Sequence, residues 1–393
     1  MNRKFLVTFS TTLLASLSSV ASIAASIAAP TVVPDPPQLS AKGYVLMDYH
    51  SGEVIVAKNA DVKMNPASLT KLMTTYVAGQ EMNRGNIGFD DQVVVSRNAW
   101  AKNFPDSSKM FIEVGTSVSM SDLYRGLIVQ SGNDASVAIA EHVAGSEAAF
   151  VSLMNSWAKK LDLQNSAFTN PHGLDSEGLY STPRDIAKLG QAIIRDLPAV
   201  YPFYSETSFT YNGITQYNRN GLLRDRSLNV DGMKTGFTSG AGYSLATSAT
   251  SGNMRLISVV MGSNSTSSRE IESKQLLSYG FRFFDTISPT DVNQVLATPR
   301  IWMGSQDELK VGIVEPVFLT LTKGESKNLH AELTYTSDIT APVKKQQVVG
   351  QVLYKIDDKV VKQVDLVALE AVDEGSLFKR VVDWFKRWLS NLF

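Results

Sequence analysis

The sequence predicts a mixed α+β fold, followed by a separate β-rich segment and a terminal amphipathic helix. Two hairpin patterns, at 43–57 and 243–261, show β-rich runs on either side of a short Gly-containing turn. Helical patterns fill much of the chain between them, and short alternating runs divided by turn residues occupy about 290–370. With 393 residues, of which 44% are apolar, the chain can form more than one domain.

The N-terminus has the three-part form of a secretory signal peptide. Two basic residues precede an apolar stretch from Phe5 to Val20, and small residues ending at Ala28 follow. We expect cleavage after Ala28, which leaves 365 residues (393 − 28). The alternative is a membrane anchor, but the hydroxyl side chains between Thr8 and Ser19 make a poor spanning helix. The sequence therefore predicts an exported protein.

The first predicted helix follows the first hairpin. Asn65 can cap it, Pro66 fits its first position, and an apolar run begins at Leu72. Ser68 and Lys71 are three residues apart, so their side chains rise from the same helix face. The first turn also places unpaired backbone N–H groups and the positive end of the helix dipole beside the Ser68 hydroxyl. This arrangement can hold an oxyanion beside a nucleophile with an amine base.

The Ser-x-x-Lys pattern is weak by itself. It recurs at Ser156 with Lys159 and at Ser376 with Lys379, and an isolated match is most often a solvated helix face. Ser68 is favoured because it follows a strand pair at a capped helix start and because two further motifs occur later in the chain.

A Ser-Gly-Asn tripeptide at 131–133 separates two predicted helices, 121–130 and 134–143. These residue types favour turns, and the glycine allows the loop to lie close to another segment. An ordinary helix connection explains the tripeptide equally well, since it recurs at 251–253 as the turn of the second hairpin.

The remaining elements follow from periodicity and turn residues. We expect helices over about 148–161, from Thr182, and from Arg269 to Phe284. His172 and Asp175 lie in a predicted polar surface loop, and we assign them no catalysis. A strand-like stretch at 230–237 ends in glycines, and 80–118 gives no clear pattern.

Composition excludes several classes of function. The formal charge is −1 and the chain has no Lys/Arg-rich block, so nothing favours nucleic acid as a partner. There are no cysteines, and the four histidines lack ligand spacing. We therefore expect neither a metal nor another cofactor. Nothing in the sequence predicts an oligomeric state.

The final segment, 376–393, separates completely into an apolar and a polar half when plotted at about 100° per residue. Four basic residues and one acid lie opposite two Trp and three Phe, which favours a helix lying in a membrane interface. The alternative is docking on the chain's own β-rich segment, which would not need the basic face. The apolar half comprises Leu377, Phe378, Val381, Val382, Trp384, Phe385, Trp388, Leu389, Leu392 and Phe393.

Three motifs occur in order: Ser68-Leu69-Thr70-Lys71, Ser131-Gly132-Asn133 and Lys234-Thr235-Gly236. This set resembles that of penicillin-binding proteins and serine β-lactamases. The mature chain is similar over essentially its whole length to the low-molecular-mass D-alanyl-D-alanine carboxypeptidases of the penicillin-binding protein 5/6 type. The resemblance implies a five-stranded antiparallel sheet with helices on its faces, an all-helical subdomain, and an active site between them.

The same resemblance divides the chain into four parts. These are a signal peptide at 1–28, a catalytic domain at 29–286, a small all-β domain at 287–371, and a membrane-anchoring amphipathic helix at 372–393. The implied location is the periplasmic face of the cytoplasmic membrane, to which the protein would bind peripherally. The implied ligands are peptidoglycan stem peptides ending in D-Ala-D-Ala, and β-lactam antibiotics.

The resemblance also implies a role for each motif residue. Ser68 would be acylated by substrate or β-lactam, and Lys71 would be the general base, its charge disfavoured by burial beside Lys234. Ser131 would relay a proton to the leaving amine, and Asn133 would orient Lys71 and the substrate amide. The oxyanion hole would be the backbone N–H groups of Ser68 and Phe237. The substrate-binding residues would be Lys234, Thr235, Gly236, Phe237 and Arg269.

One position departs from the family pattern. Many relatives have His after Lys-Thr-Gly, and this chain has Phe237, so we expect slower or altered turnover. A β-lactamase is disfavoured because those enzymes lack the β-rich segment and the tail, and because 165–185 contains no Glu-x-x-Asn. A non-catalytic peptidoglycan-binding scaffold is the other alternative, and the intact Ser68, Lys71 and Lys234 count against it.

Overall fold

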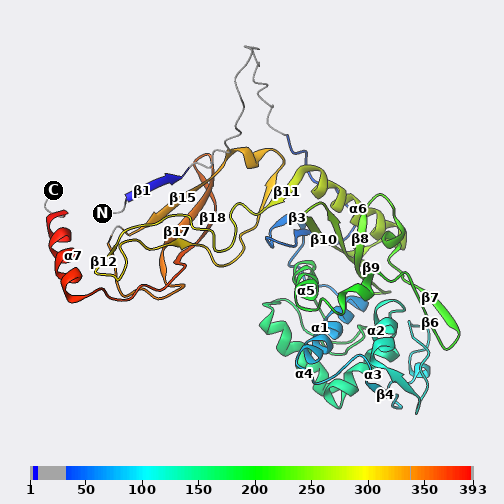
Figure 1. Ribbon diagram of the computed structural model, residues 1–393. Coiled ribbons are helices and arrows are strands. Elements are labelled where there is room, and N and C mark those ends of the chain that lie inside the picture. The colour runs from blue at the N-terminus through cyan, green and yellow to red at the C-terminus, as the bar shows by residue number, and fades with distance from the viewer. Residues whose placement is uncertain (1–2, 8–31, 337, 391–393) are drawn as a thin grey trace, which may run out of the picture. The chain divides into compact units, whose positions relative to one another are not determined.

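The computed structural model describes residues 3–7, 32–336 and 338–390 (Figure 1). The chain forms two compact units, one of residues Pro34–Phe283 and one of Met1–Val33 with Phe284–Phe393. Each unit has its own cluster of buried apolar side chains. The expected cleavage site after Ala28 lies outside the described residues.

The unit Pro34–Phe283 is built on a five-stranded antiparallel sheet in the order β3-β2-β10-β9-β8. Both predicted hairpins are confirmed, as β2–β3 and β9–β10, and the glycine-ended stretch is the edge strand β8. The strands are β2 (Gly43–Asp48), β3 (Val54–Lys58), β8 (Asn229–Thr238), β9 (Gly242–Ser251) and β10 (Met254–Ser263).

Helices cover both faces of this sheet. Helix α6 (Thr266–Phe283) brings Gly280 against Leu256, whereas α5 (Pro183–Asp196) lies close to Ile257. Leu256 and Ile257 are neighbours on β10, so their side chains point to opposite faces. Helix α6 begins three residues before the expected start at Arg269, which places Arg269 within its first turn.

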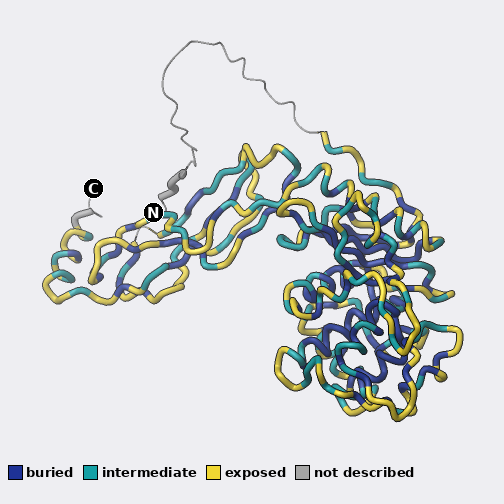
Figure 2. Tube along the Cα trace, turned by 45° about the vertical axis from the view of Figure 1, so that its right-hand side comes forward, coloured by how far each residue is buried: buried dark blue, intermediate teal, exposed yellow. Residues whose placement is uncertain are grey.

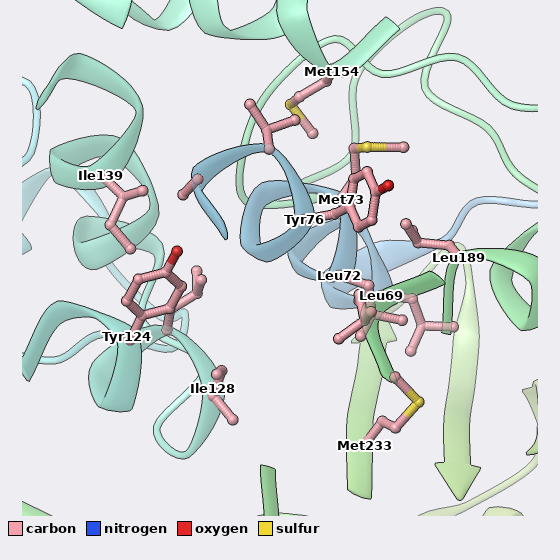
Figure 3. Close-up of a cluster of buried hydrophobic side chains, with 14 of the residues drawn as sticks. Leu69, Leu72, Met73, Tyr76, Tyr124, Ile128, Ile139, Met154, Leu189 and Met233 are labelled. Carbon is pink, nitrogen blue, oxygen red and sulfur yellow. The ribbon is translucent and has the colours of Figure 1, made fainter. Parts of the chain in front are cut away.

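The helical half of this unit contains α1 (Thr70–Asn83), α2 (Met120–Ile128), α3 (Asn133–Ala144) and α4 (Glu147–Lys160). Helix α1 is its centre, because every residue from 70 to 79 is buried. Figure 3 shows side chains of α1 among residues of the other helices and of β8, and Figure 2 shows the buried segments concentrated here. Burial on α1 therefore begins before the predicted apolar run at Leu72 and includes polar residues such as Lys71 and Thr74.

Short elements complete this unit, including the stretch 80–118 that the sequence left without a clear pattern. Strand β4 (Gln92–Val94) pairs with β5 (Ser117–Ser119), and β6 (Ser208–Tyr211) pairs with β7 (Ile214–Tyr217). The 3₁₀ turns are η1 (Ala67–Leu69), η2 (Ala101–Asn103), η3 (Tyr201–Ser205) and η4 (Gly221–Arg224).

The predicted all-β segment is confirmed in the second unit. Its largest sheet has the order β1-β15-β17-β18-β13, and two small sheets pair β11 with β14 and β12 with β16. Strand β1 (Arg3–Val7) belongs to the predicted leader. The others are β11 (Phe284–Ile287), β12 (Ile301–Trp302), β13 (Val311–Gly312), β14 (Leu319–Thr322), β15 (Leu329–Tyr335), β16 (Ile339–Thr340), β17 (Val348–Ile356) and β18 (Lys359–Ala368), with the 3₁₀ turn η5 (Glu325–Asn328).

The predicted terminal helix is present as α7 (Leu377–Ser390), and residues 391–393 lie outside the described part. Its apolar side chains are exposed and its polar side faces the β-rich unit. Among the described residues, no single helix is long and apolar enough to cross a bilayer. The pair α3–α4 passes that test only as two helices bent by 84°.

Candidate active site

Ser68 lies in the 3₁₀ turn η1, directly before α1, rather than within the α-helix that the sequence predicted. Asn65 still supports the turn, because its Oδ1 accepts a hydrogen bond from the Ala67 N–H at 2.8 Å. Ala67 has a φ of +47°, which is uncommon for a residue with a side chain. The nucleophile's turn is therefore held in a specific backbone conformation by its surroundings.

Lys71 is almost fully buried, and its Nζ has three partners. The distances are 3.1 Å to Ser68 Oγ, 2.7 Å to Asn133 Oδ1 and 2.6 Å to the His172 carbonyl oxygen. Two of these oxygens only accept hydrogen bonds, so they take the two hydrogens of a neutral amine. The remaining lone pair faces the Ser68 hydroxyl. The arrangement suits an amine that removes the Ser68 proton.

The charge state of Lys71 follows from its surroundings. Burial, together with the nearby Arg219 guanidinium, lowers the pKa of Lys71 to about 7. The sequence led us to expect Lys234 as the neighbouring cation. Burial and the charges of Lys71, Arg219 and Arg269 lower the pKa of Lys234 as well. These cations raise the cost of a further positive charge, and an anionic ligand would relieve it.

The loop between α2 and α3 brings the second motif into the site. Ser131 has a φ of +60°, and its Oγ accepts a hydrogen bond from Lys234 Nζ at 2.9 Å. Asn133 is the first residue of α3, and its Nδ2 donates to Ser107 Oγ at 2.9 Å. Each lysine is therefore paired with one serine, Lys71 with Ser68 and Lys234 with Ser131.

Strand β8 forms one wall beside the nucleophile. A Cβ added at Gly236 would lie 3.0 Å from the Pro66 carbonyl oxygen and 3.4 Å from Ala67 Cβ, so the backbone of β8 passes close to the Ser68 turn. This brings the backbone at Gly236 and Phe237 to the position expected for one side of an oxyanion hole.

A cavity of about 780 Å³ opens above these residues. It has a cationic floor, and its walls come from the sheet, the helical half and the loops between them. Its size suits a small peptide segment or a drug-sized ligand. The lining includes the predicted residues Ser68, Ser131, Asn133, Thr235, Gly236, Phe237 and Arg269.

Arg219 is a member of the site that the sequence did not reveal. It lines the cavity, and its Nη1 donates a hydrogen bond to Ser108 Oγ. Arg269 donates to the Gly236 carbonyl oxygen at 3.3 Å, while its buried Nε has no hydrogen-bond partner among the described residues. The two guanidinium groups that line the cavity can bind a carboxylate. No local pattern marks Arg219, which lies between β7 and η4.

The loop at 170–175 is less exposed than the predicted polar surface loop, because Pro171 and Gly173 are buried and His172 is half-buried. The carbonyl oxygen of His172 accepts the shortest hydrogen bond of Lys71. Gly173 has a φ of +86°, and a Cβ there would lie 1.9 Å from the Ala67 carbonyl oxygen. The loop therefore supports the nucleophile's turn through its backbone. Burial and the Lys71 charge lower the pKa of the His172 imidazole to about 3, so this ring is neutral.

A second supporting loop comes from the stretch that had no clear pattern. Ser107 and Ser108 line the cavity and contact Asn133 and Arg219, respectively. The loop is anchored by buried Asp134, whose carboxylate accepts hydrogen bonds from the three backbone N–H groups of residues 110–112 at 2.8–3.2 Å. The residue after Asn133 thus fixes the loop that Asn133 contacts.

Phe237 has a defined environment. Its side chain is half exposed at the cavity wall and stacks on Tyr243, with ring centroids 4.3 Å apart. The Arg269 guanidinium lies over the Tyr243 ring, 5.8 Å from its centroid. An apolar, non-titrating surface therefore follows the Lys-Thr-Gly motif at the cavity wall.

Other sequence expectations can be placed as well. Ser156 and Lys159 lie on the exposed face of α4, so this second Ser-x-x-Lys match is a solvated helix surface. Within the described ranges, no group of three or more His, Asp or Glu side chains is arranged to hold a metal ion.

Comparison with known families matches both units of the chain. The model of a family described as D-alanyl-D-alanine carboxypeptidase matches residues 30–265. A second model, described as the C-terminal domain of penicillin-binding protein 5, matches residues 284–374. Helix α7 lies beyond both matches.

Individual relatives agree with these matches. The chain is 48% identical to D-alanyl-D-alanine carboxypeptidase DacA of Escherichia coli over 367 residues, covering 92% of this chain and 91% of DacA. It superposes on penicillin-binding protein 5 from Haemophilus influenzae with a TM-score of 0.84 and 48% identity, covering 87% of this chain and all of that structure. Penicillin-binding protein D2 from Listeria monocytogenes in its ampicillin-bound form has a TM-score of 0.57 and 30% identity, covering 63% of this chain and all of that structure.

Proposed function

This chain belongs to the D-alanyl-D-alanine carboxypeptidase family and is a serine-type enzyme of that family, and from this premise we propose how its residues perform the reaction. The substrate is a peptidoglycan stem peptide ending in D-Ala-D-Ala, and Ser68 is the nucleophile. The observation that carries this assignment is the contact between Ser68 Oγ and the buried, doubly hydrogen-bonded Lys71 amine.

Acylation begins with transfer of the Ser68 proton to Lys71. Ser68 Oγ then attacks the carbonyl carbon of the penultimate residue, and the oxyanion accepts hydrogen bonds from the backbone N–H groups of Ser68 and Phe237. Because the Nζ hydrogens of Lys71 are fixed on Asn133 and His172, its lone pair stays directed at Ser68. This orientation reduces the reorganisation needed in the transition state.

The tetrahedral intermediate collapses when the amide C–N bond breaks. Ser131, hydrogen-bonded to Lys234 Nζ, passes a proton to the leaving amine and takes in its place the proton that Lys71 accepted from Ser68, so D-alanine departs and Lys71 is neutral again. Water then attacks the ester on Ser68 while Lys71 accepts its proton, and Lys71 returns that proton to Ser68 Oγ as the shortened peptide is released. A β-lactam is attacked by the same route, and its ring-opened acyl group stays on Ser68.

The terminal carboxylate of the substrate binds in the cationic part of the cavity. Thr235 lines this part of the cavity from β8, next to buried Lys234, and Arg219 and Arg269 line it with planar guanidinium groups. A carboxylate there favours the charged form of Lys234, because the anion offsets the repulsion that lowers its pKa. This explains a preference for peptides with a free C-terminus.

The second partner is the membrane surface. Helix α7 exposes six large apolar side chains, of which two are tryptophans, and such a helix lies in the headgroup region of a bilayer. The enzyme thus acts peripherally at the periplasmic face of the cytoplasmic membrane, where its cell-wall substrate is found. Residues 29–286 form the catalytic domain in this scheme, 287–371 the all-β domain and 372–393 the anchor.

The assignment of Ser68 is tested by replacing it with alanine. Release of D-alanine from a pentapeptide ending in D-Ala-D-Ala should fall by a factor of about 10³ or more, and a fluorescent penicillin should no longer label the chain. Ser156→Ala is the matched control, because it removes a serine from the same Ser-x-x-Lys pattern on an exposed helix face. Continued release and labelling in Ser68→Ala would refute the mechanism.

A further inference from the structure

Helix α7 is attached by its polar side. Six large apolar residues are between 51% and 82% exposed and follow one another at helical spacing, which puts them on one face. Among the described side chains of the helix only Asp383 is buried, with 2% exposure. The exposed residues are Leu377, Phe378, Val381, Trp384, Phe385 and Trp388.

Asp383 is fully engaged by the β-rich unit. One carboxylate oxygen accepts a hydrogen bond from Arg300 Nη2 at 3.0 Å, and the other accepts the Met303 backbone N–H at 3.0 Å. The Arg300 guanidinium also lies over the Trp302 ring, 4.2 Å from its centroid. Because the carboxylate is buried, loss of either donor would leave it poorly compensated. The contact therefore has one specific geometry.

The segment leading into α7 is tied to the same place. Met303 has a φ of +58°, and its carbonyl oxygen accepts a hydrogen bond from the Gly375 N–H at 2.8 Å. Met303 thus holds the entry to the helix through its carbonyl and the middle of the helix through its N–H. A Cβ at Gly375 would lie 2.6 Å from the Gly304 carbonyl oxygen, so the two backbones pass in close contact.

Most basic residues of α7 are neutralised by acids of their own unit. Lys379 Nζ lies 3.0 Å from Asp307, and Arg380 lies 2.6 Å from Glu374. Arg387 pairs with Asp338. For Lys386 the described residues include no ion pair. We expected that docking on the β-rich segment would not need the basic face; in the structure, three of its four basic residues have acidic partners within their own unit.

We propose that Asp383 and Arg300 form a latch that fixes α7 on the β-rich unit by its polar face and presents the apolar face to the headgroup–acyl boundary of an uncharged lipid surface. This inference rests on the membrane association proposed above and specifies its chemistry. Since the internal acids already offset the basic residues, insertion of apolar side chains supplies the binding, and anionic lipid adds little.

The latch is tested in solution by hydrogen exchange of the α7 amides. In the chain purified from a bacterium that exports it, Asp383→Asn and Arg300→Gln should each raise α7 exchange about tenfold or more. The double variant should exchange no faster than either single one, because both break the same contact. Asp307→Asn, which removes an exposed ion pair, should change it less than about twofold. Release of D-alanine should stay unchanged in all four.

Unchanged α7 exchange in Asp383→Asn would overturn the latch. Additive effects of Asp383→Asn and Arg300→Gln would overturn the direct pairing. Thermal unfolding of the β-rich unit, monitored in the same samples, shows whether Arg300→Gln acts through the fold of that unit; Asp383→Asn changes only the helix and keeps the test independent of it.

The lipid preference is tested by vesicle sedimentation. The unaltered chain should bind phosphatidylcholine vesicles and vesicles containing half phosphatidylglycerol with partition coefficients within about threefold, at both low and high salt. Asp383→Asn frees the basic residues of α7 from their acidic partners. Each basic residue strengthens binding to an anionic surface about fivefold, so the preference of this variant for phosphatidylglycerol should rise at least tenfold. Strong binding of the unaltered chain to anionic vesicles alone would overturn the inference and leave membrane association standing. Binding to neither vesicle would overturn both.

Discussion

In the proposed mechanism, the reactivity of Ser68 depends on whether the neighbouring Lys71 amine is neutral. Lys71 Nζ lies beside two carbonyl-type oxygens, which can only accept hydrogen bonds, and its third contact is Ser68 Oγ. An ammonium ion there would direct its third hydrogen at the serine and could not accept the serine proton. Burial and the Arg219 charge favour the neutral amine, with a pKa of Lys71 of about 7.

The rate of acylation should therefore depend on pH through Lys71. Below about pH 7 the amine is protonated, so the rate of labelling by a fluorescent penicillin should fall about tenfold per pH unit; above about pH 8 it should level off. Arg219→Gln removes a repelling charge and should move the midpoint to higher pH. Stopped-flow labelling between pH 5 and 9 measures both, and a flat profile for the unaltered enzyme would contradict the neutral-amine mechanism.

Phe237 gives a second test at the same scale. A half-exposed phenyl ring stacked on Tyr243 cannot exchange protons, whereas an imidazole at that place can. Phe237→His should raise the rate of deacylation about threefold or more, while Phe237→Leu should not. Separate acylation and deacylation rate constants with a fluorescent penicillin measure this. Identical constants in Phe237→His and the unaltered enzyme would remove the idea.

Residue types and their order predicted which motif residues meet. Ser68, Lys71 and Asn133 share one set of hydrogen bonds, and Ser131 and Lys234 form a second pair at the same site. Arg219, Ser108 and His172 could not be found in this way. Arg219 and Ser108 reach the site only because of the tertiary fold. His172 contributes a backbone oxygen, which every residue has, so no local pattern distinguishes any of the three.

At the scale of elements, the hairpins and most helices follow from periodicity, caps and turns. Thr182 caps α5 by accepting the Asp185 N–H, as its place before Pro183 suggested. The stretch 80–118 could not be read because its strands have three residues each and its loop is held by Asp134, far along the chain. Long-range hydrogen bonds, rather than local preference, determine this segment.

The loop at Gly173 makes a prediction about how elements support one another. Gly173→Ala places a methyl group 1.9 Å from the Ala67 carbonyl oxygen, so the turn that carries Ser68 must move. We expect acylation to fall about 100-fold or more, since catalysis is sensitive to displacements near 1 Å. Gly178→Ala is the matched control, because Gly178 also has positive φ, +79°, but a Cβ there would meet only Thr169 Cγ2, at an ordinary contact distance of 3.5 Å. Penicillin labelling rates compare the two.

If the rate of acylation falls equally in Gly173→Ala and Gly178→Ala, the effect is due to backbone strain alone. Far-ultraviolet circular dichroism and the midpoint of thermal unfolding establish that both variants fold. The steric explanation requires a large difference in acylation between two variants of similar stability.

For the whole molecule, the division into two cores determines which part of the chain can be deleted. Every buried apolar residue of the first core comes from residues 45–261, and every one of the second from 301–372. Two cores without shared members are expected to unfold separately. The sequence predicted this division from the change from helical to alternating patterns near Pro289.

Because all the catalytic groups that we propose belong to Pro34–Phe283, a chain ending at Phe283 should keep its activity. We expect release of D-alanine from a soluble pentapeptide within about twofold of the full chain. We also expect one calorimetric unfolding transition, where the full chain shows two. The shortened chain loses α7 and with it the exposed apolar face, so it should not sediment with vesicles. A folded but inactive shortened chain would mean that residues after Phe283 contribute to the site, against the assignment of every catalytic group to the first unit.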